Sequence, residues 1–316
     1  MDVAGLYTFA WRHAPKVPEP LLRAASTVAA DVTWLRHGAG VRRLEANYAR
    51  VRPELDARAV RRLSREGMRR YFRYFREAFT LQGFDAEQVA ARVRTEGAEH
   101  VLATTRTGGA VVLALGHTGN WDLAGAWATP HLAPVLTVAE RLEPEALFTE
   151  FVGFRRSIGI DVLALGDEGV FRDLVRGVQG GSRIVPLLSD RDLTSGGVEV
   201  DLCGHRARVA AGPAALAVAT GAPLVPVGIF HERLRGERRR RAGSAWGIVI
   251  RFHPPVEPSD GGSRREQVDR LTQRWVDAFG GFLAERTEDW HMLQKVFVAD
   301  LDPDRYARTR ARAGEA

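Results

Sequence analysis

The sequence LALGHTGNWDLAG, residues 113–125, places a glycine, a histidine and an aspartate directly behind an apolar run. The apolar residues 111–115 are typical of a short buried strand. Gly116 and Gly119, on either side of His117, allow a sharp turn and the close approach of another molecule. The apolar residues that follow indicate the beginning of a helix. We therefore expect His117 to lie in a strand-to-helix loop, where open α/β sheets bind their ligands.

Strand-like and helix-like segments alternate from about residue 108 onward. Such alternation favours a largely parallel sheet covered by helices. We predict an α/β fold with a mostly parallel central sheet flanked by helices. Apolar strand-like runs occur at 110–115, 134–138, 160–165, 183–188, 224–230 and 247–252. Helical patterns occur at 119–128, 143–158, 168–178, 211–220 and 264–284.

The remaining segments carry weaker patterns. Residues 1–100 show little β patterning and predict a helical N-terminal region. The arginine-rich stretch 231–247 predicts a basic loop between the last two strands, and residues 303–316 predict a polar, frayed tail. Because the sequence shows no internal repeat and no clear linker, we expect one domain over 1–316 with an α/β core over 108–300.

One N-terminal helix is predicted in more detail, over RAVRRLSREGMRRYFRYFREAFTL, residues 58–81. Apolar residues recur near helical spacing, and arginines fill another face. This pattern is compatible with binding to a membrane surface and equally with a helix that packs on the core with its arginines in water. We predict that residues 1–100 are the membrane-facing part of the chain, with peripheral attachment through the arginines and aromatic residues of 60–79. The apolar stripe contains Val60, Leu63, Gly67, Tyr71, Phe75 and Phe79, and the arginines are Arg62, Arg65, Arg69, Arg73 and Arg76.

The composition points to an anionic partner. The chain has a net charge of +6, and 43 of its 45 basic residues are arginine because only Lys16 and Lys295 are lysine. Phosphates of a cofactor, lipid headgroups and nucleic acid all fit this charge. The single Cys203 excludes an intramolecular disulfide and a cysteine-based zinc cluster and suggests a reducing cytoplasm. No apolar stretch approaches the roughly 18 residues of a membrane span, and no signal-peptide pattern is evident.

The pair His117 and Asp122 suggests acid–base chemistry. The two side chains can meet only if His117 precedes the helix and Asp122 lies in its first turn, where the helix dipole favours a carboxylate. Asp122 would then accept a hydrogen bond from one imidazole nitrogen and leave the other as a general base. No nucleophilic Ser or Cys is evident beside them, so the base would act on a substrate hydroxyl. A loop histidine beside a helix-capping aspartate is the alternative.

Further charged residues follow other predicted strands. Asp190, Arg191 and Asp192 come directly after the strand-like run that ends at residue 188. An arginine held between acids presents its guanidinium to a phosphate or an oxyanion, and a surface ion-pair cluster is the alternative. Glu140 follows another such run. Arg155 ends the next helical pattern, where a solvated position is the alternative.

Five motifs resemble those of a known family. The H-x-x-x-x-D pattern at His117 resembles the motif of the lysophospholipid and lipid A acyltransferases. The order and spacing of the five are most similar to the actinobacterial phosphatidylinositol mannoside acyltransferases, over residues 60–301. The motifs are ALGHTGNWDLAGAW (114–127), TVAERLEPEALF (137–148), FRRSIGIDVL (154–163), DRDLTSGGVEVDL (190–202) and EDWHMLQ (288–294).

The resemblance implies an α/β acyltransferase. The expected reaction moves a long acyl group, palmitoyl, from acyl-CoA to a mannose hydroxyl of a phosphatidylinositol mannoside. We expect no metal, no resident cofactor and no nucleic-acid partner, and a peripheral monomer on the anionic cytoplasmic face of the plasma membrane. The alternatives are an acyltransferase with another glycolipid or phospholipid acceptor and a non-catalytic membrane-binding protein.

The resemblance also implies roles for single residues. His117 matches the catalytic base and Asp122 its orienting acid. Asp190 stands where the family branch more usually has glutamate, and its shorter side chain calls a direct contact with His117 into question. The expected catalytic residues are thus His117, Asp122 and Asp190. The expected substrate-binding residues are Glu140, Arg155, Arg191, Asp192, Asn120 and Glu199. Of these, Glu140 and Arg155 match charged residues that line the family's polar site. By residue type, the carboxylates and amide of Asp190, Asp192, Asn120 and Glu199 suit a mannose.

Overall fold

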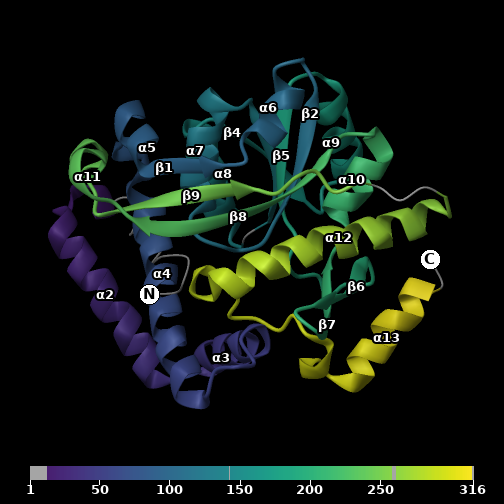
Figure 1. The fold of residues 1–316 in the computed structure, drawn as a ribbon, viewed down its shortest axis with the longest axis horizontal. Coiled ribbons are helices and arrows are strands. Elements are labelled where there is room, and N and C mark those ends of the chain that lie inside the picture. Colours follow the sequence, from purple (N-terminus) through teal and green to yellow (C-terminus); the bar gives the residue numbers. More distant parts are fainter. Residues whose placement is uncertain (1–12, 142, 258–260, 315–316) are drawn as a thin grey trace.

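A seven-stranded sheet forms the centre of the computed structural model, which describes residues 13–141, 143–257 and 261–314 (Figure 1). In spatial order the strands are β1 (Val93–Glu96), β9 (Trp246–Phe252), β8 (Leu224–Arg233), β2 (Ala110–Leu115), β5 (Arg183–Leu188), β3 (Val135–Glu140) and β4 (Ile160–Leu165). The five strands from β8 to β4 run parallel to one another. β9 pairs antiparallel with β8 and parallel with β1. A separate antiparallel hairpin consists of β6 (Gly197–Leu202) and β7 (His205–Ala210).

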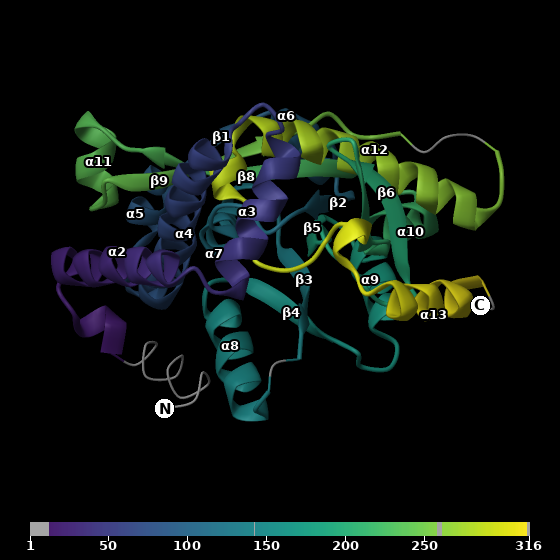
Figure 2. The same ribbon diagram turned by 90° about the horizontal axis from the view of Figure 1, so that it is seen from below.

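Helices cover both faces of the sheet (Figures 1 and 2). Alternate residues of β2 belong to two apolar clusters, one on each face, which explains why this strand reads as a continuous apolar run. One face is covered by α9 (Val170–Gln179), α10 (Gly212–Thr220) and α12 (Arg264–Glu285), and the other by α6 (Glu99–Thr105), α7 (Trp121–His131) and α8 (Glu145–Ser157). The other helices are α2 (Glu19–Arg36), α3 (Ala39–Val51), α4 (Ala57–Thr80), α5 (Ala86–Arg92), α11 (Gly236–Ala242) and α13 (Pro303–Gly314). Short 3-10 turns are η1 (Ala14–Lys16), η2 (Leu81–Gly83), η3 (Thr287–Asp289) and η4 (Val298–Asp300).

The predicted fold class is confirmed. Every strand-like run forms a strand of the central sheet, and three of them, 110–115, 160–165 and 183–188, have the observed bounds. Each helical pattern after residue 108 forms a helix with ends shifted by a few residues. Apolar periodicity located these elements because each of them buries one stripe or both faces against a neighbour.

Four segments differ from the prediction. β1 lies within the region expected to be helical, since four residues with two charges give no readable alternation. The hairpin of β6 and β7 was not predicted. The stretch 231–247 is not a loop: β8 and β9 continue into it, and its GERRRRA segment forms α11. Residues 303–314 form α13 rather than a frayed tail. Residues 1–12 of the predicted helical region lie outside the described residues.

The amphipathic helix α4 is an internal element, which corrects its interpretation as a free membrane-binding face. Arg65 and Arg69 both donate to Asp31 of α2, and Arg70 pairs at 2.6 Å with the fully buried Asp289 of η3. These arginines therefore contact other parts of the protein, whereas Arg62 of the same face is exposed. Periodicity identified the apolar stripe, but it carries no information about what covers the opposite face.

The loop between β2 and α7 is held from outside the central sheet. Gly119 has a positive φ of 59°, and its N–H donates to the carbonyl of Asp289 at 3.0 Å. A Cβ on Gly119 would lie 2.5 Å from the carbonyl oxygen of Ile229. Asn120 then caps α7, because its Oδ1 accepts from the N–H of Leu123 at 3.0 Å. Backbone conformation and close packing both require glycine at position 119.

Gly119→Ala should lower the free energy of unfolding by about 3 kcal/mol, since a left-handed residue with a Cβ costs about 1–2 kcal/mol and overpacking adds a similar amount. Gly221→Ala is the matched control: its φ is 73°, and no described atom lies within 4 Å of its Cβ position. In Gly221→Ala, the free energy of unfolding should fall only by the cost of the left-handed conformation, about 1–2 kcal/mol. Urea unfolding measures both, and equal losses would contradict the close approach.

Candidate active site

His117 and Asp190 meet at the carboxyl edge of the sheet. His117 follows β2 and Asp190 follows β5, the parallel neighbour of β2. The imidazole Nδ1 lies 2.6 Å from Asp190 Oδ1, and the backbone N–H of His117 donates to Oδ2 at 3.0 Å. The N–H of Ser189 donates to the carbonyl of Leu115 at 2.8 Å, so the two chains leave the sheet side by side. This edge is where open α/β sheets bind ligands.

The ionisation of this pair suits a general base. Burial disfavours the charged form of both groups. For His117, the charge of Asp190 and its hydrogen bond outweigh the effect of burial and raise the pKa above its ordinary value. The pKa of Asp190 is lowered despite its burial, by the imidazole and by the Trp290 N–H. The ionised carboxylate only accepts hydrogen bonds, so His117 carries its proton on Nδ1. Its Nε2 has no protein partner among the described residues. The side chain is 39% exposed on the wall of a cleft, where neutral His117 can take a proton from a hydroxyl.

Asp122 does not orient His117, contrary to the interpretation of the sequence. It lies in the first turn of α7, as expected. Its Oδ1 accepts from Arg155 Nε at 2.9 Å, and its Oδ2 accepts from the Tyr74 hydroxyl at 2.9 Å. Both oxygens are thus used in a buried cluster that joins α4, α7 and α8. The acid that contacts His117 is Asp190, whose short side chain suffices because the ends of β2 and β5 are adjacent.

Aromatic side chains form the wall of the cleft beside His117. The Trp121 ring is edge-on to the imidazole, with 5.5 Å between the ring centroids. Tyr71 and Phe75 of α4 line the same cleft and contact each other at 4.8 Å between centroids. Part of the apolar stripe that was compatible with a membrane surface therefore faces the candidate active site.

Four of the six expected substrate-binding residues lie on this cleft, namely Glu140, Arg155, Arg191 and Asp192. Glu140 is exposed at the end of β3. Arg155 is buried against Asp122. The Nε of Arg191 donates to the carbonyl of Lys295 at 3.1 Å. Sequence reasoning thus brought together charged residues from two strand ends, those of β3 and β5, and from one helix, α8.

The other two expected residues, Asn120 and Glu199, do not belong to this cleft. Asn120 is fully buried, and its Nδ2 donates to Glu77 Oε2 at 3.1 Å while its Oδ1 caps α7. Glu199 of β6 lines a second cleft, where it pairs with Arg208 and accepts from the hydroxyl of Tyr306. Their residue types suit a sugar, but other parts of the protein already use their polar atoms.

A mostly apolar slot opens from the cleft between α7 and the sheet. On the helix side its wall is made by the small residues Ala124, Gly125 and Ala128. Gly125 allows close packing, since a Cβ there would lie 2.4 Å from Ile160 Cδ1. On the sheet side, apolar residues of β2, β5, β8 and β9 line the slot. The slot and the cleft share Trp121, Val138, Arg155 and Leu188.

The segment from Asp289 to His291 completes the site, and sequence reasoning gave it no chemical role. Trp290 Nε1 donates to Asp190 Oδ2 at 2.8 Å. The N–H of His291 donates to the carbonyl of His117 at 2.8 Å, and its Nε2 lies 3.0 Å from the carbonyl of Gly119. The motif EDWHMLQ was the one sequence signal for this segment. We call residues 287–292 the C-terminal strap.

A buried charged network anchors the strap. Asp289 lies 2.7 Å from Nδ1 of His231 on β8 and pairs with Arg70 of α4. Burial lowers the pKa of His231 well below its ordinary value and that of His291 to about 3. Both imidazoles are therefore neutral, and His291 donates from Nε2 to Gly119. Within the described residues, no group of three or more His, Cys, Asp or Glu side chains is placed to hold a metal ion.

Comparisons with known proteins agree with the motif resemblance. Residues 3–298 match the model of the bacterial lipid A biosynthesis acyltransferases. The chain is 36% identical over 304 residues to the phosphatidylinositol mannoside acyltransferase of Mycolicibacterium smegmatis, covering 96% of this chain and 93% of that protein. It is also 36% identical over 310 residues to the protein of that name from Mycobacterium tuberculosis, with 97% and 92% covered. These matches confirm the family resemblance.

One solved structure is also similar. It is the crystal structure of the 1-acyl-sn-glycerophosphate acyltransferase from Thermotoga maritima, which aligns with 68% of this chain and 88% of that chain. The TM-score is 0.36 and the sequence identity is 15%.

Asp190→Asn should move the acid limb of the activity–pH profile to lower pH. If His117 is the base, activity needs the neutral imidazole and falls as the pH drops through the pKa of His117, which Asp190 raises. The amide keeps the shape of the side chain but removes the charge, so the pKa of His117 falls and the limb moves with it. The maximal rate should drop about 10²–10⁴-fold, because the base is weaker and its tautomer less well held. Rates measured across the acid limb test this, and an unmoved limb would exclude Asp190 as the partner.

Proposed function

The chain belongs to the bacterial lipid A biosynthesis acyltransferase family, and from this premise we propose that it transfers a palmitoyl group from acyl-CoA to a mannose hydroxyl of a phosphatidylinositol mannoside. The names of its mycobacterial relatives support the acceptor. The observation that carries the proposal is the position of His117. It pairs with Asp190 and lines a cleft that meets an apolar slot.

In the proposed reaction, His117 Nε2 removes the proton of the acceptor hydroxyl as its oxygen attacks the thioester carbonyl. Asp190 stabilises the imidazolium that forms. The tetrahedral intermediate then collapses: the carbon–sulfur bond breaks, and the His117 proton passes to the departing CoA sulfur. The products are the acylated sugar and free CoA thiol, with His117 neutral again. No step requires a metal ion or a covalent acyl–enzyme.

The two spaces around His117 suit the two substrates. The slot beneath α7 takes the acyl chain, because burial of each methylene contributes about 0.8 kcal/mol. The cleft takes the acceptor headgroup: Tyr71, Phe75 and Trp121 offer ring faces, and Glu140 and Asp192 offer carboxylates for hydroxyl groups. The cleft also carries Arg191 and Arg308, and guanidinium groups bind phosphate well.

His117→Ala should lower acyl transfer from palmitoyl-CoA about 10²–10⁴-fold, the usual contribution of a general base. His131→Ala is the matched control, since this exposed histidine ends α7 and stacks on Trp127 outside the cleft. Mass spectrometry of the lipid product measures transfer, and thermal unfolding checks that both variants fold. If His117→Ala kept more than about a tenth of wild-type turnover, the role as base would be wrong.

An acceptor panel separates this proposal from the closest alternative. Wild-type protein is supplied with palmitoyl-CoA and either mannosylated phosphoinositide, unmannosylated phosphoinositide or a lysophospholipid. Acylation of the mannosylated lipid alone supports the proposed acceptor. Transfer to the other two at equal rates would favour a broader lipid acyltransferase, and no transfer to any acceptor would contradict the proposed enzyme.

We further propose that α2 attaches the protein peripherally, as a monomer, to the anionic cytoplasmic face of the membrane. No helix in the described part of the chain has the length and apolar character needed to cross a bilayer. One side of α2 leaves Leu21, Val28, Val32 and Leu35 exposed by 40–67%, at spacings of seven, four and three residues. That apolar stripe faces away from α4, and it can be buried in the lipid at a membrane surface.

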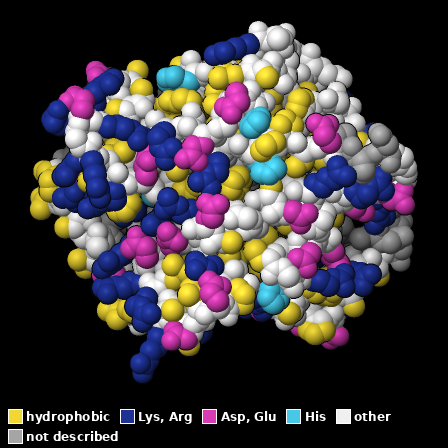
Figure 3. Space-filling model, in the orientation of Figure 1, with side chains coloured by type: hydrophobic (Ala, Val, Ile, Leu, Met, Phe, Trp, Pro, Cys, Tyr) yellow, Lys and Arg dark blue, Asp and Glu magenta, His cyan; other side chains and the backbone are white. Residues whose placement is uncertain are grey.

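Basic residues support an anionic surface as the occupant. Lys16, Arg23 and Arg36 are exposed on or beside α2. Helix α11, whose sequence is GERRRRA, lies at the same end of the molecule as α2 in both ribbon views, and Figure 3 shows Lys and Arg side chains at that end. An apolar stripe with basic flanks is the pattern of a helix that lies in the plane of the membrane interface. The membrane-facing element is therefore α2 rather than α4.

Val28→Glu with Leu35→Glu should weaken sedimentation with phosphatidylglycerol-containing vesicles at least tenfold, since two buried side chains contribute about 1.5–3 kcal/mol each. Ala103→Glu with Thr107→Glu adds the same charge at exposed positions on and just after α6 and should have little effect. Binding should also weaken with salt, because exposed charges are screened. Equal vesicle binding by both double variants would exclude α2 as the attachment site.

A further inference from the structure

We propose that Trp290 is a positioning residue for the pair His117 and Asp190, which we call the dyad. The indole N–H of Trp290 holds the Asp190 carboxylate and thereby sets the pH range in which His117 works as a base. The proposal rests on the proposed function only for its kinetic test. Trp290 belongs to the C-terminal strap, 100 residues from Asp190 in sequence, and it touches neither the cleft nor the slot.

The Asp190 carboxylate accepts three hydrogen bonds from the described residues, and the indole of Trp290 donates one of them. Oδ1 lies 2.6 Å from His117 Nδ1. Oδ2 accepts from the backbone N–H of His117 at 3.0 Å and from Trp290 Nε1 at 2.8 Å. Asp190 is fully buried, so water cannot replace a missing donor without entering the core. The indole N–H is the one side-chain donor on this carboxylate, within the described residues, that does not itself take part in proton transfer.

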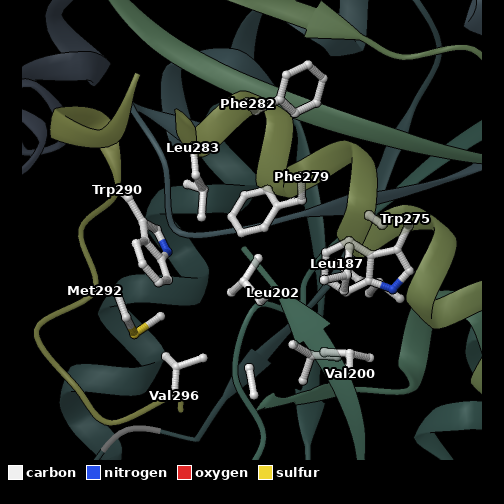
Figure 4. Close-up of a cluster of buried hydrophobic side chains, with 14 of the residues drawn as sticks. Leu187, Val200, Leu202, Trp275, Phe279, Phe282, Leu283, Trp290, Met292 and Val296 are labelled. Atoms are coloured by element: carbon white, nitrogen blue, oxygen red, sulfur yellow. The ribbon is translucent and has the colours of Figure 1, made fainter. Parts of the chain in front are cut away.

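Trp290 is held rigidly enough to fix this geometry. It is fully buried, and its ring lies edge-on to Phe279 and Phe297 at 6.4 and 6.5 Å between centroids. Its carbonyl accepts from the hydroxyl of Tyr48 at 2.9 Å, and its backbone pairs with Thr118 in the histidine loop. Figure 4 shows the indole in the apolar cluster beside Phe279, with Trp275 on the other side of that ring. Indole and imidazole are therefore fixed relative to the same carboxylate.

The other charged groups near the dyad do not duplicate this role. Arg191 at the end of β5 and Arg155 of α8 both lower the pKa of His117. His291 of the strap is neutral, since its pKa is about 3. From α4, Tyr74 donates to Asp122 and Tyr71 lines the cleft. Among the described groups, Trp290 and His117 are those that donate to Asp190 itself.

Removal of the indole N–H should change the pKa of His117 in one direction. Asp190 would lose a donor that stabilises its charge, and its remaining attraction for the proton on His117 would grow. The imidazolium would be held more strongly, so the pKa of His117 would rise. Because the neutral imidazole is the active form, the acid limb would move to higher pH. Loss of the Asp190 charge moves it to lower pH, and general damage to the fold lowers activity without moving it.

The test compares Trp290→Phe with Trp275→Phe in the full chain. Both indoles are fully buried in the same cluster and pack on Phe279. Trp275 Nε1 has no hydrogen-bond partner among the described residues, so its replacement removes a buried indole that serves no acceptor. The rate of palmitoyl-CoA hydrolysis without acceptor is measured against pH for both variants and for wild type, which avoids any dependence on the acceptor's identity.

Trp290→Phe should move the acid limb to higher pH by up to about one pH unit, because only the part of the hydrogen-bond energy that differs between neutral and protonated His117 changes the pKa of the imidazole. Below the limb the rate should fall by up to about tenfold, and KM for palmitoyl-CoA should change little. Trp275→Phe should leave the limb in place. A limb that stays fixed in Trp290→Phe, or moves equally in both variants, would overturn the proposal.

A second measurement needs no enzymatic activity and no altered tryptophan in the core. In protein labelled with ¹⁵N-tryptophan, the indole N–H resonance of Trp290 should shift with pH, because its acceptor carboxylate faces a titrating imidazole. His117→Ala should abolish the shift. A resonance that is insensitive to pH in wild type, or that still shifts in His117→Ala, would overturn the proposal. If the protein had no acyltransferase activity at all, this result would still decide the role of Trp290.

Discussion

The hydrogen bond between His117 and Asp190 is the constraint on which the rest of the site depends. It joins groups 73 residues apart in sequence, so neither the loop nor the strand end creates it alone. It requires β2 and β5 to be adjacent, parallel and in register to their last residues, and the bond from Ser189 to Leu115 continues that register beyond the sheet. Apolar clusters on both faces keep this edge rigid. The sheet thus supplies a distance that a flexible loop could not hold.

The sheet positions His117 and Asp190. The loop that carries His117 is held by the C-terminal strap, which is itself bonded to α3. Asn47 of α3 donates to the carbonyl of Met292, and Tyr48 donates to that of Trp290. The strap in turn bonds the backbone of His117 and Gly119. The N-terminal helices are therefore joined to the loop that carries His117 through two layers of hydrogen bonds, although they are far from it in sequence. Strain in α3 or α4 would reach the dyad by this route.

Sequence reasoning predicted the parallel sheet and the position of His117, because buried strands and small residues at a turn leave strong local patterns. It misjudged the partner of His117. Asp122 is five residues away in sequence and reads as the natural acid, but the first turn of α7 directs it to Arg155 and Tyr74. Asp190, the true partner, is defined only by strand order. Trp290 was missed for the same reason, because only the fold brings it to Asp190. Asn120 and Glu199 were wrongly expected in the site, since residue type does not reveal which polar atoms already have a partner within the protein.

Asp122 does not contact His117, but it fixes the shape of the cleft beside it. Its ion pair with Arg155 is buried at the junction between cleft and slot. A buried pair adds little net stability, because desolvation offsets most of its attraction, yet breaking it is costly. Such a pair is poorly suited to strengthening the fold and well suited to fixing a geometry. Here it ties α7 to α8 beside Trp121, so the opening through which an acyl chain would enter has a set width. The two acids associated with His117, one by sequence and one by contact, thus have separate positions: Asp190 contacts the imidazole, and Asp122 ties α7 to α8 where the cleft meets the slot.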